Sequence, residues 1–211
     1  MRAKVIIGAT AAALVLAVLP SAAAGGGPKP LPQANAEALA SAPGHVAAPV
    51  VHRVGAREAL AAAAQPGAQT EVAPGLTLGQ AVGLTAAADG VAPRRLARTA
   101  ASTICWNGQI HGSWGYWPYN QTVYDSTYWC AVSGGALSYR STNVTHSATL
   151  CSGSGDYTFR ISGGVGYTYV AYQVGASFTC PTDLPWITVY RSDWLDDEVN
   201  DYGSMFTYAS S

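Results

Sequence analysis

The first half of the chain lacks aromatic residues and cysteine. All 21 Phe, Trp and Tyr residues of the 211-residue sequence lie between Trp106 and Tyr208, and all four cysteines lie between Cys105 and Cys180. Aromatic side chains contribute much of the apolar area in packed cores, so the first half can bury little. We therefore expect one folded domain, over residues 103–211.

The second half also lacks lysine. Residues 103–211 hold three Arg and no Lys against eight Asp and Glu, a formal net charge of −5, whereas residues 1–102 hold eight Lys and Arg against four acidic residues. Proteins grip phosphate backbones with clustered Lys and Arg. The composition of the expected domain argues against a nucleic-acid partner.

Only one long apolar run is present, at the N-terminus. Arg2 and Lys4 precede an apolar stretch over residues 5–19, a proline ends it, and small residues follow up to Ala24. This order is typical of a secretory signal peptide over residues 1–24. The alternative is a retained anchor, since the run approaches the ~20 residues that span a bilayer. We favour cleavage after Ala24, which predicts a secreted protein, extracellular or cell-wall associated, with no membrane contact after cleavage.

Residues 25–102 are rich in Ala, Pro and Gly. Short helical patterns recur, but prolines interrupt them, and isolated helices shorter than ~12 residues are marginal in water. The composition predicts a largely disordered or weakly helical segment, either a linker or a propeptide. Arg95 and Arg98 belong to a basic cluster just before the first cysteine, where proteolytic processing is plausible. Cleavage near Arg98 would leave one domain of ordinary size.

Period-2 alternation between turn residues predicts strands throughout residues 103–211. In the clearest case, residues 169–180, alternate apolar side chains from Val170 to Phe178 share one face. Other strands are expected near Ile104 or Ile110 and at 123–132, 135–140, 144–151, 157–161, 186–191 and 204–208. About seven to eight strands predict an all-β fold, a small antiparallel sandwich or barrel. Within residues 103–211, only residues 192–200 have the pattern of a short helix.

Four cysteines in an exported chain predict two disulfides. Three pairings are possible. We favour Cys105 with Cys130 and Cys151 with Cys180, because sequential strands neighbour each other more often than distant ones.

Several short motifs surround these cysteines. They are Cys105-Trp106, Tyr128-Trp129-Cys130 followed by Gly134-Gly135, Leu137 and Tyr139, and Phe178-Thr179-Cys180. This pattern resembles a loose group of small secreted, disulfide-bonded domains of high-GC Gram-positive bacteria, which has no established function. The resemblance covers about the last half of the chain. It implies a secreted β domain and transfers no site residues.

Aromatic residues are densest in residues 113–120. Flat rings separated by Gly and Pro suit stacking on sugars, and they suit protein interfaces equally well. The candidate ligand-binding residues are Trp114, Tyr116, Trp117, Tyr119 and Asn120. In the alternative interpretation, the rings only pack in the core or in a turn.

Five acidic residues lie within residues 193–201. Asp196, Glu198 and Asn200 alternate as weak calcium-ligand candidates, but the glycine of a calcium loop is absent. A solvated acidic face is the favoured interpretation, so we predict no metal or cofactor. His111 and His146 are the only histidines of this half, and no catalytic motif is present.

These features predict a secreted, non-catalytic binding domain. Its partner is either a cell-wall or extracellular polysaccharide, bound through exposed Trp and Tyr, or an extracellular protein. In the second case the domain would be a protease inhibitor or toxin-like factor released near Arg98. A small extracellular hydrolase is a further alternative, which would need a pair of carboxylates brought together by folding.

Overall fold

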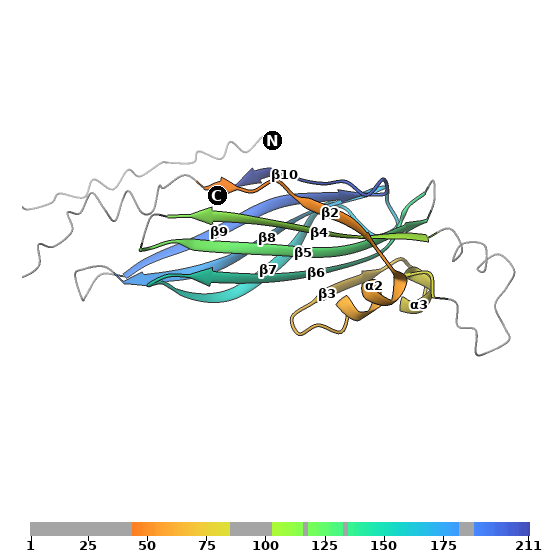
Figure 1. The fold of residues 1–211 in the computed structure, drawn as a ribbon, viewed down its shortest axis with the longest axis horizontal. Coiled ribbons are helices and arrows are strands. Elements are labelled where there is room, and N and C mark those ends of the chain that lie inside the picture. The colour runs from red at the N-terminus through yellow and green to blue at the C-terminus, as the bar shows by residue number, and fades with distance from the viewer. Residues whose placement is uncertain (1–43, 85–102, 116–117, 133–134, 182–187) are drawn as a thin grey trace, which may run out of the picture. The chain divides into compact units, whose positions relative to one another are not determined.

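The computed structural model describes residues 44–84, 103–115, 118–132, 135–181 and 188–211. Ten strands in these ranges form two antiparallel sheets, whose facing sides share one apolar core. Figure 1 shows the two layers, with the green strands of one sheet in front of the blue strands of the other. The all-β sandwich prediction is therefore confirmed.

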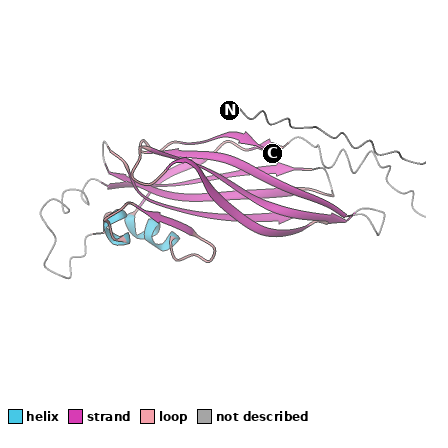
Figure 2. Cartoon of the chain, turned by 180° about the vertical axis from the view of Figure 1, so that it is seen from behind, coloured by secondary structure: helices cyan, strands magenta, loops and turns pink. Residues whose placement is uncertain are grey.

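The larger sheet has six strands in the order β1-β4-β5-β6-β3, with β2 also pairing with β4. Its strands are β1 (His45–Val46), β2 (Val50–Val54), β3 (Gln69–Val72), β4 (Thr103–Trp114), β5 (Gln121–Val132) and β6 (Leu137–Ala148). Residues 137–148 form one continuous strand, where the sequence pattern predicts two. Helices α2 (Ala56–Ala62) and α3 (Leu78–Ala81) lie together near one end of this sheet, as Figure 2 shows in cyan.

The smaller sheet has four strands in the order β10-β9-β8-β7. They are β7 (Ser152–Gly163), β8 (Tyr169–Pro181), β9 (Thr188–Asn200) and β10 (Met205–Ser210). The face predicted for residues 169–180 is confirmed, because the alternate residues from Val170 to Phe178 are at most 1% exposed. The strand predicted at 157–161 lies within β7, but its alternate apolar residues do not form a buried face: Phe159 is 53% and Ile161 44% exposed.

Both predicted disulfides are confirmed. Cys105 pairs with Cys130 between register partners of β4 and β5, and Cys151 pairs with Cys180. Successive residues of a strand point to opposite faces. Trp106 and Trp129 therefore face the other sheet, with ring centroids 5.9 Å apart, whereas the Cys105–Cys130 bridge lies on the outer face of its own sheet.

The expected domain start at residue 103 needs correction, because residues 44–84 are built into the sandwich. β2 pairs with β4 and β3 pairs with β6, so the Ala-rich segment supplies edge strands of the larger sheet. Ala59 and Ala81 are fully buried in a second cluster with Tyr139 and the Cys105–Cys130 bridge. Alanine allows this close approach, and the aromatic half supplies the apolar surface that the segment itself lacks.

The helix expected at residues 192–200 is also wrong, because β9 continues as a strand to Asn200. Inward residues alternate with outward ones along this stretch: Asp193, Leu195, Asp197 and Val199 are buried. Two of the inward residues are acidic. The alternation of apolar and polar residues that marks a strand is therefore not visible in this part of the sequence. Partners inside the sandwich make their burial possible.

Candidate functional site

The structure buries the two described rings of the predicted ligand-binding segment. Trp114 is 2% exposed and Tyr119 9% exposed, so neither presents a free aromatic face. Asn120 is exposed, and Tyr116 and Trp117 lie outside the described residues. The expectation of an exposed platform is wrong for Trp114 and Tyr119, which take the core role considered as its alternative.

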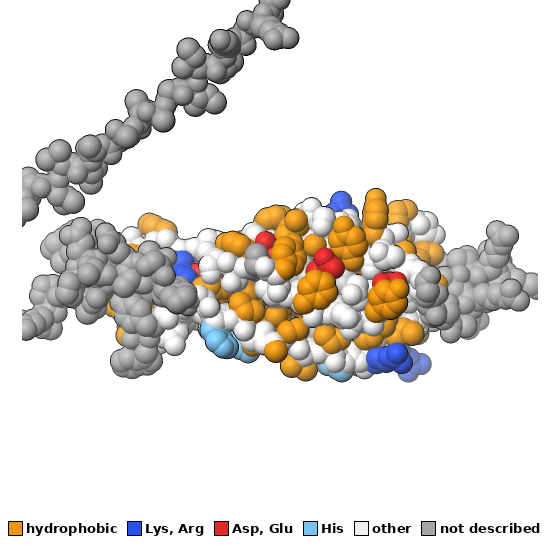
Figure 3. All heavy atoms as spheres, turned by 90° about the horizontal axis from the view of Figure 1, so that it is seen from above, with side chains coloured by type: hydrophobic (Ala, Val, Ile, Leu, Met, Phe, Trp, Pro, Cys, Tyr) orange, Lys and Arg blue, Asp and Glu red, His pale blue; other side chains and the backbone are white. Residues whose placement is uncertain are grey.

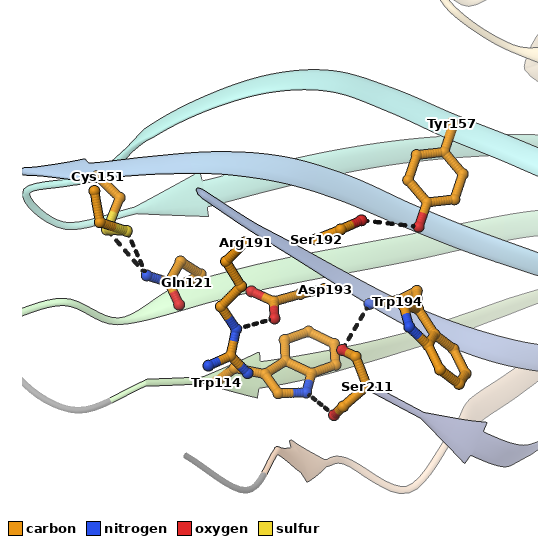
Figure 4. Close-up of polar contacts among 10 residues, drawn as sticks. Trp114, Gln121, Cys151, Tyr157, Arg191, Ser192, Asp193, Trp194 and Ser211 are labelled. Carbon is orange, nitrogen blue, oxygen red and sulfur yellow. Dashed lines mark hydrogen bonds and ion pairs between the residues drawn. A yellow bond between two sulfur atoms is a disulfide. The ribbon is translucent and has the colours of Figure 1, made fainter. Parts of the chain in front are cut away.

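Trp114 ends β4 inside the sandwich. Its ring lies against the backbones of Gly44 and Gly112, where any side chain would collide with it. Its indole Nε1 donates to the carbonyl oxygen of Ser211 at 2.6 Å, and the Ser211 hydroxyl accepts from the backbone N–H of Trp194 (Figure 4). These contacts tie the last residues of the described chain to the core.

The three calcium-ligand candidates lie on the outward side of β9. Asp196, Glu198 and Asn200 are each two positions apart, which separates neighbours by about 6.6 Å along a strand. Within the described ranges no group of three or more His, Cys, Asp or Glu side chains is placed to hold a metal ion. The strand geometry therefore spreads these oxygen atoms apart instead of gathering them.

An open groove crosses the outer face of the smaller sheet. It has a volume of about 430 Å³ and is lined by Ser162, Tyr169, Ala171, Glu198, Phe206 and Tyr208. Tyr169, Phe206 and Tyr208 are 37%, 41% and 52% exposed. Figure 3 shows hydrophobic side chains in orange gathered around the few red acidic groups in this view of the surface. We refer to these six residues as the aromatic groove.

One row of paired residues runs beneath the aromatic groove across all four strands. Phe206 of β10 pairs with Glu198 of β9. Glu198 in turn pairs with Ala171 of β8, and Ala171 pairs with Ser162 of β7. Directly paired side chains lie on one face about 5 Å apart. Along this row, the Phe206 ring and the Glu198 carboxylate are followed by two small side chains. Because Ala171 and Ser162 are small, an open space remains above them, and this space is the groove.

Two more rings stand beside this row. Tyr169 lies two positions before Ala171 on the same face of β8, and Tyr208 lies two positions after Phe206. A register shift between Thr207 and Ala209 leaves Tyr208 without a partner on β9. Such bulges re-aim side chains, and this one leaves Tyr208 lining the groove.

The carboxylate of Glu198 differs from its neighbour on the same strand. Asp196 accepts a 2.7 Å hydrogen bond from Nε2 of Gln173. Over the described part of the chain, Glu198 has no hydrogen-bond or ion-pair partner. Partial burial raises its pKa. The pKa of the Tyr208 hydroxyl is also raised, first by burial and then by the charges of Asp196 and Glu198.

A second pair of acidic residues is sealed inside the sandwich. Asp125 of β5 is 1% exposed and Asp197 of β9 is fully buried. Burial raises the pKa of Asp125 to about 6 and that of Asp197 to about 9, and the nearby Asp125 charge adds to the rise for Asp197. The Asp197 carboxyl therefore favours its protonated form at neutral pH, and among the described residues its Oδ2 has no hydrogen-bond partner.

Hydroxyl groups complete this buried network. The Tyr172 hydroxyl donates to Asp125 at 2.9 Å, and the Thr127 hydroxyl contacts the other oxygen of Asp125, also at 2.9 Å. Thr207 donates to Asp197. The guanidinium of Arg140 lies 4.5 Å from the Tyr172 ring centre and pairs with Glu71. With both carboxyls shut off from solvent, the network is a structural core feature and gives no support to a hydrolase.

His146 is the other titratable side chain with a close acidic partner. Its Nδ1 lies 2.5 Å from Asp156 of β7, and its ring meets Phe178 edge-on with centroids 5.5 Å apart. Its Nε2 side is packed over Gly153. These contacts make His146 a link between β6 and the following strand.

Sequence reasoning missed the aromatic groove. Phe206 and Tyr208 fall in the predicted strand at 204–208, and their alternation there was the available signal. Their alternation does not say which of the two faces points outward. That assignment needs the pairing of β10 with β9, which only the assembled sheet shows. Tyr169 was assignable to the less apolar face of its own strand.

The predicted processing residues Ala24, Arg95 and Arg98 lie outside the described residues. Among the helices that the structure describes, none has the length and apolar character needed to cross a membrane. Comparison with protein-family models, with curated proteins and with solved structures gives no match for this chain.

Proposed function

We propose that the protein is a secreted, non-catalytic domain that binds polysaccharide through the aromatic groove. The observation that carries this proposal is the placement of three partly exposed rings, Tyr169, Phe206 and Tyr208, around the carboxylate of Glu198 on an open sheet face. Rings of this kind combine flat apolar area with polar tips. The groove volume lies within the roughly 300–1,000 Å³ of small-ligand sites, enough for one or two sugar rings.

The extracellular part of the proposal has separate support. The N-terminal 24 residues follow the order of a secretory signal. Both disulfides are formed and no cysteine of the chain is left free, which agrees with an oxidising compartment. Rigid bridges also suit a domain whose binding face must be held in one shape.

The test is retention of the whole oxidised protein on insoluble cellulose, chitin and peptidoglycan. We expect Phe206→Ala with Tyr169→Ala to abolish retention, since both rings line the groove and neither belongs to the core. Tyr190→Ala is the matched control, because Tyr190 is 80% exposed on the same sheet outside the groove. Retention of the double variant at the level of the unchanged protein would overturn the proposal. Binding to whole cells that survives polysaccharide digestion would instead indicate a protein partner.

A further inference from the structure

Glu198, which has no hydrogen-bond or ion-pair partner among the described residues, is a carboxylate set among aromatic rings. Its backbone pairs directly with that of Phe206, and Tyr208 and Tyr169 line the same groove. Asp196, the next outward carboxylate, is already engaged by Gln173 at 2.7 Å. One acidic group in the groove is thus free to meet a charge from a ligand, while its neighbour on the strand is not.

Within the described part of the chain, the lining of the groove holds no cation that competes for Glu198. None of its six lining residues is basic. Two of the three arginines in residues 103–211 are paired elsewhere: Arg140 contacts Glu71 and Arg191 contacts Asp193. The side chain of Arg160 lies against Gly164, which directly follows β7 and donates its backbone N–H to the carbonyl oxygen of Tyr169. The groove lining itself thus carries one acidic and no basic side chain, and residues 103–211 carry a formal net charge of −5.

Aromatic faces and a carboxylate together select for an ammonium group. The negative face of each ring attracts a cation within ~6 Å of its centre, and a carboxylate supplies the counter-charge. A neutral sugar would gain the ring contacts but would cover the Glu198 carboxylate without pairing it, which is unfavourable. An acidic sugar would be repelled.

Resting on the proposed polysaccharide binding, we infer that the aromatic groove recognises polysaccharides with free amino groups, with the ammonium of a glucosamine-type unit paired to Glu198 and held against Phe206 and Tyr208. N-acetylated units would lose this contact because acetylation removes the charge. The specificity of the groove is thus for deacetylated over acetylated amino sugars.

The test compares two oligosaccharides of equal length, one of glucosamine and one of N-acetylglucosamine, by titration calorimetry on the whole protein at a pH where the amine is charged. We expect the glucosamine oligomer to bind about 10-fold tighter. Glu198→Gln should remove that preference, so that the two oligomers bind this variant with equal affinity. Asp196→Asn is the matched control. Asp196 lies two residues before Glu198 on the same face of β9 and is already bonded to Gln173, so this variant should retain the preference.

The outcomes separate the two proposals. Equal binding of both oligomers by the unchanged protein overturns the ammonium inference and leaves polysaccharide binding standing. Preference that persists in Glu198→Gln overturns the assigned residue and with it the inference. If the unchanged protein binds neither oligomer and no neutral polysaccharide, the proposed function itself is overturned. A lysine oligomer that binds as tightly as the amino sugar, and also depends on Glu198, overturns the sugar assignment.

Discussion

The Tyr139 hydroxyl on β6 donates a 2.7 Å hydrogen bond to the backbone carbonyl of Ala59 in α2, 80 residues earlier in the chain. The neighbouring Ser138 hydroxyl reaches the carbonyl of Ala81 at 2.6 Å. Both bonds are buried, and buried carbonyl groups need such partners. Residues 44–84 are therefore held by specific contacts to the aromatic half and belong to the same folded unit.

Overpacking at Ala59 should destabilise the protein. Ala59→Leu adds volume to a fully buried site against Tyr139 and should lower the free energy of unfolding by about 1–3 kcal/mol. Ala61→Leu is the control, since Ala61 is exposed on the same helix and should change stability little. Denaturant unfolding of both variants measures the difference. Equal stability of the two would mean that α2 does not pack as described.

Cleavage near Arg95 or Arg98 should not release the N-terminal segment. β2 and β3 would stay paired with β4 and β6, so a nicked protein should elute from gel filtration as one species. Because all four cysteines lie after residue 104, denaturant alone should separate the two pieces without reductant. Intact mass and gel filtration of protease-treated protein check this. Immediate loss of the N-terminal piece in native buffer would contradict it.

The buried acid pair should make the protein more stable in acid than in alkali. Asp125 and Asp197 have folded-state pKa values of about 6 and about 9, above the unfolded value of 3.8. The folded state then binds more protons than the unfolded state between pH ~4 and ~9. Stability from this pair is fully present below pH ~4 and is lost as pH rises towards ~9. Melting temperatures across this range measure the trend.

Asp197→Asn provides the control for the pH trend. The amide oxygen can still accept from the Thr207 hydroxyl, and the amide does not ionise. We expect a flatter dependence of the melting temperature on pH above neutrality. An unchanged slope would show that other groups cause the trend.

The two disulfides should not be equivalent. Each closes a loop of similar length, with sequence separations of 25 and 29, so each should contribute about 3 kcal/mol in the chain-entropy model. Nε2 of the fully buried Gln121 also lies 2.9 and 3.1 Å from the sulfur atoms of Cys151 and Cys180 (Figure 4). Replacing both of those cysteines by Ala removes its acceptors and should cost about 1–3 kcal/mol more. Denaturant unfolding of the two double-Ala variants compares them, and equal losses would rule out the Gln121 contribution.

Trp114→Ala should unfold or strongly destabilise the protein, by about 3–5 kcal/mol, because the ring is buried. Phe206→Ala should leave the melting temperature nearly unchanged, since that ring is 41% exposed. Circular dichroism melts distinguish the two. A stable Trp114→Ala variant would return the 113–120 segment to consideration as a surface site.

Much of the fold was predictable, because local alternation and cysteine spacing report directly on strands. The buried face from Val170 to Phe178 and both disulfide pairs follow from such local signals. The role of Ala59 was not predictable, because an alanine becomes a core residue only when Tyr139 is brought against it by the topology. Asp193 and Asp197 misled the reading of β9 in the same way: carboxyls suit the interior only when Arg191, Asp125 and Thr207 face them.

The candidate site was less predictable than the fold. A groove depends on which residues of four different strands become neighbours, and Phe206, Glu198, Ala171 and Ser162 are adjacent only in the assembled sheet. The high number of aromatic residues in the 113–120 segment pointed to Trp114 instead. A domain with little leucine, however, needs its aromatic rings to fill the core. Core rings and binding-site rings differ in their solvent exposure, which the number of aromatic residues in a segment does not report.

The larger sheet also joins strands that are far apart along the chain. Gln69 of β3 pairs with Thr142 of β6, and Val54 of β2 pairs with Cys105 of β4, about 50 to 70 residues later in the chain. Non-local pairing of this kind slows folding, to milliseconds or seconds in all-β domains. Until β2 has docked, the long β4 strand presents an open edge to other chains.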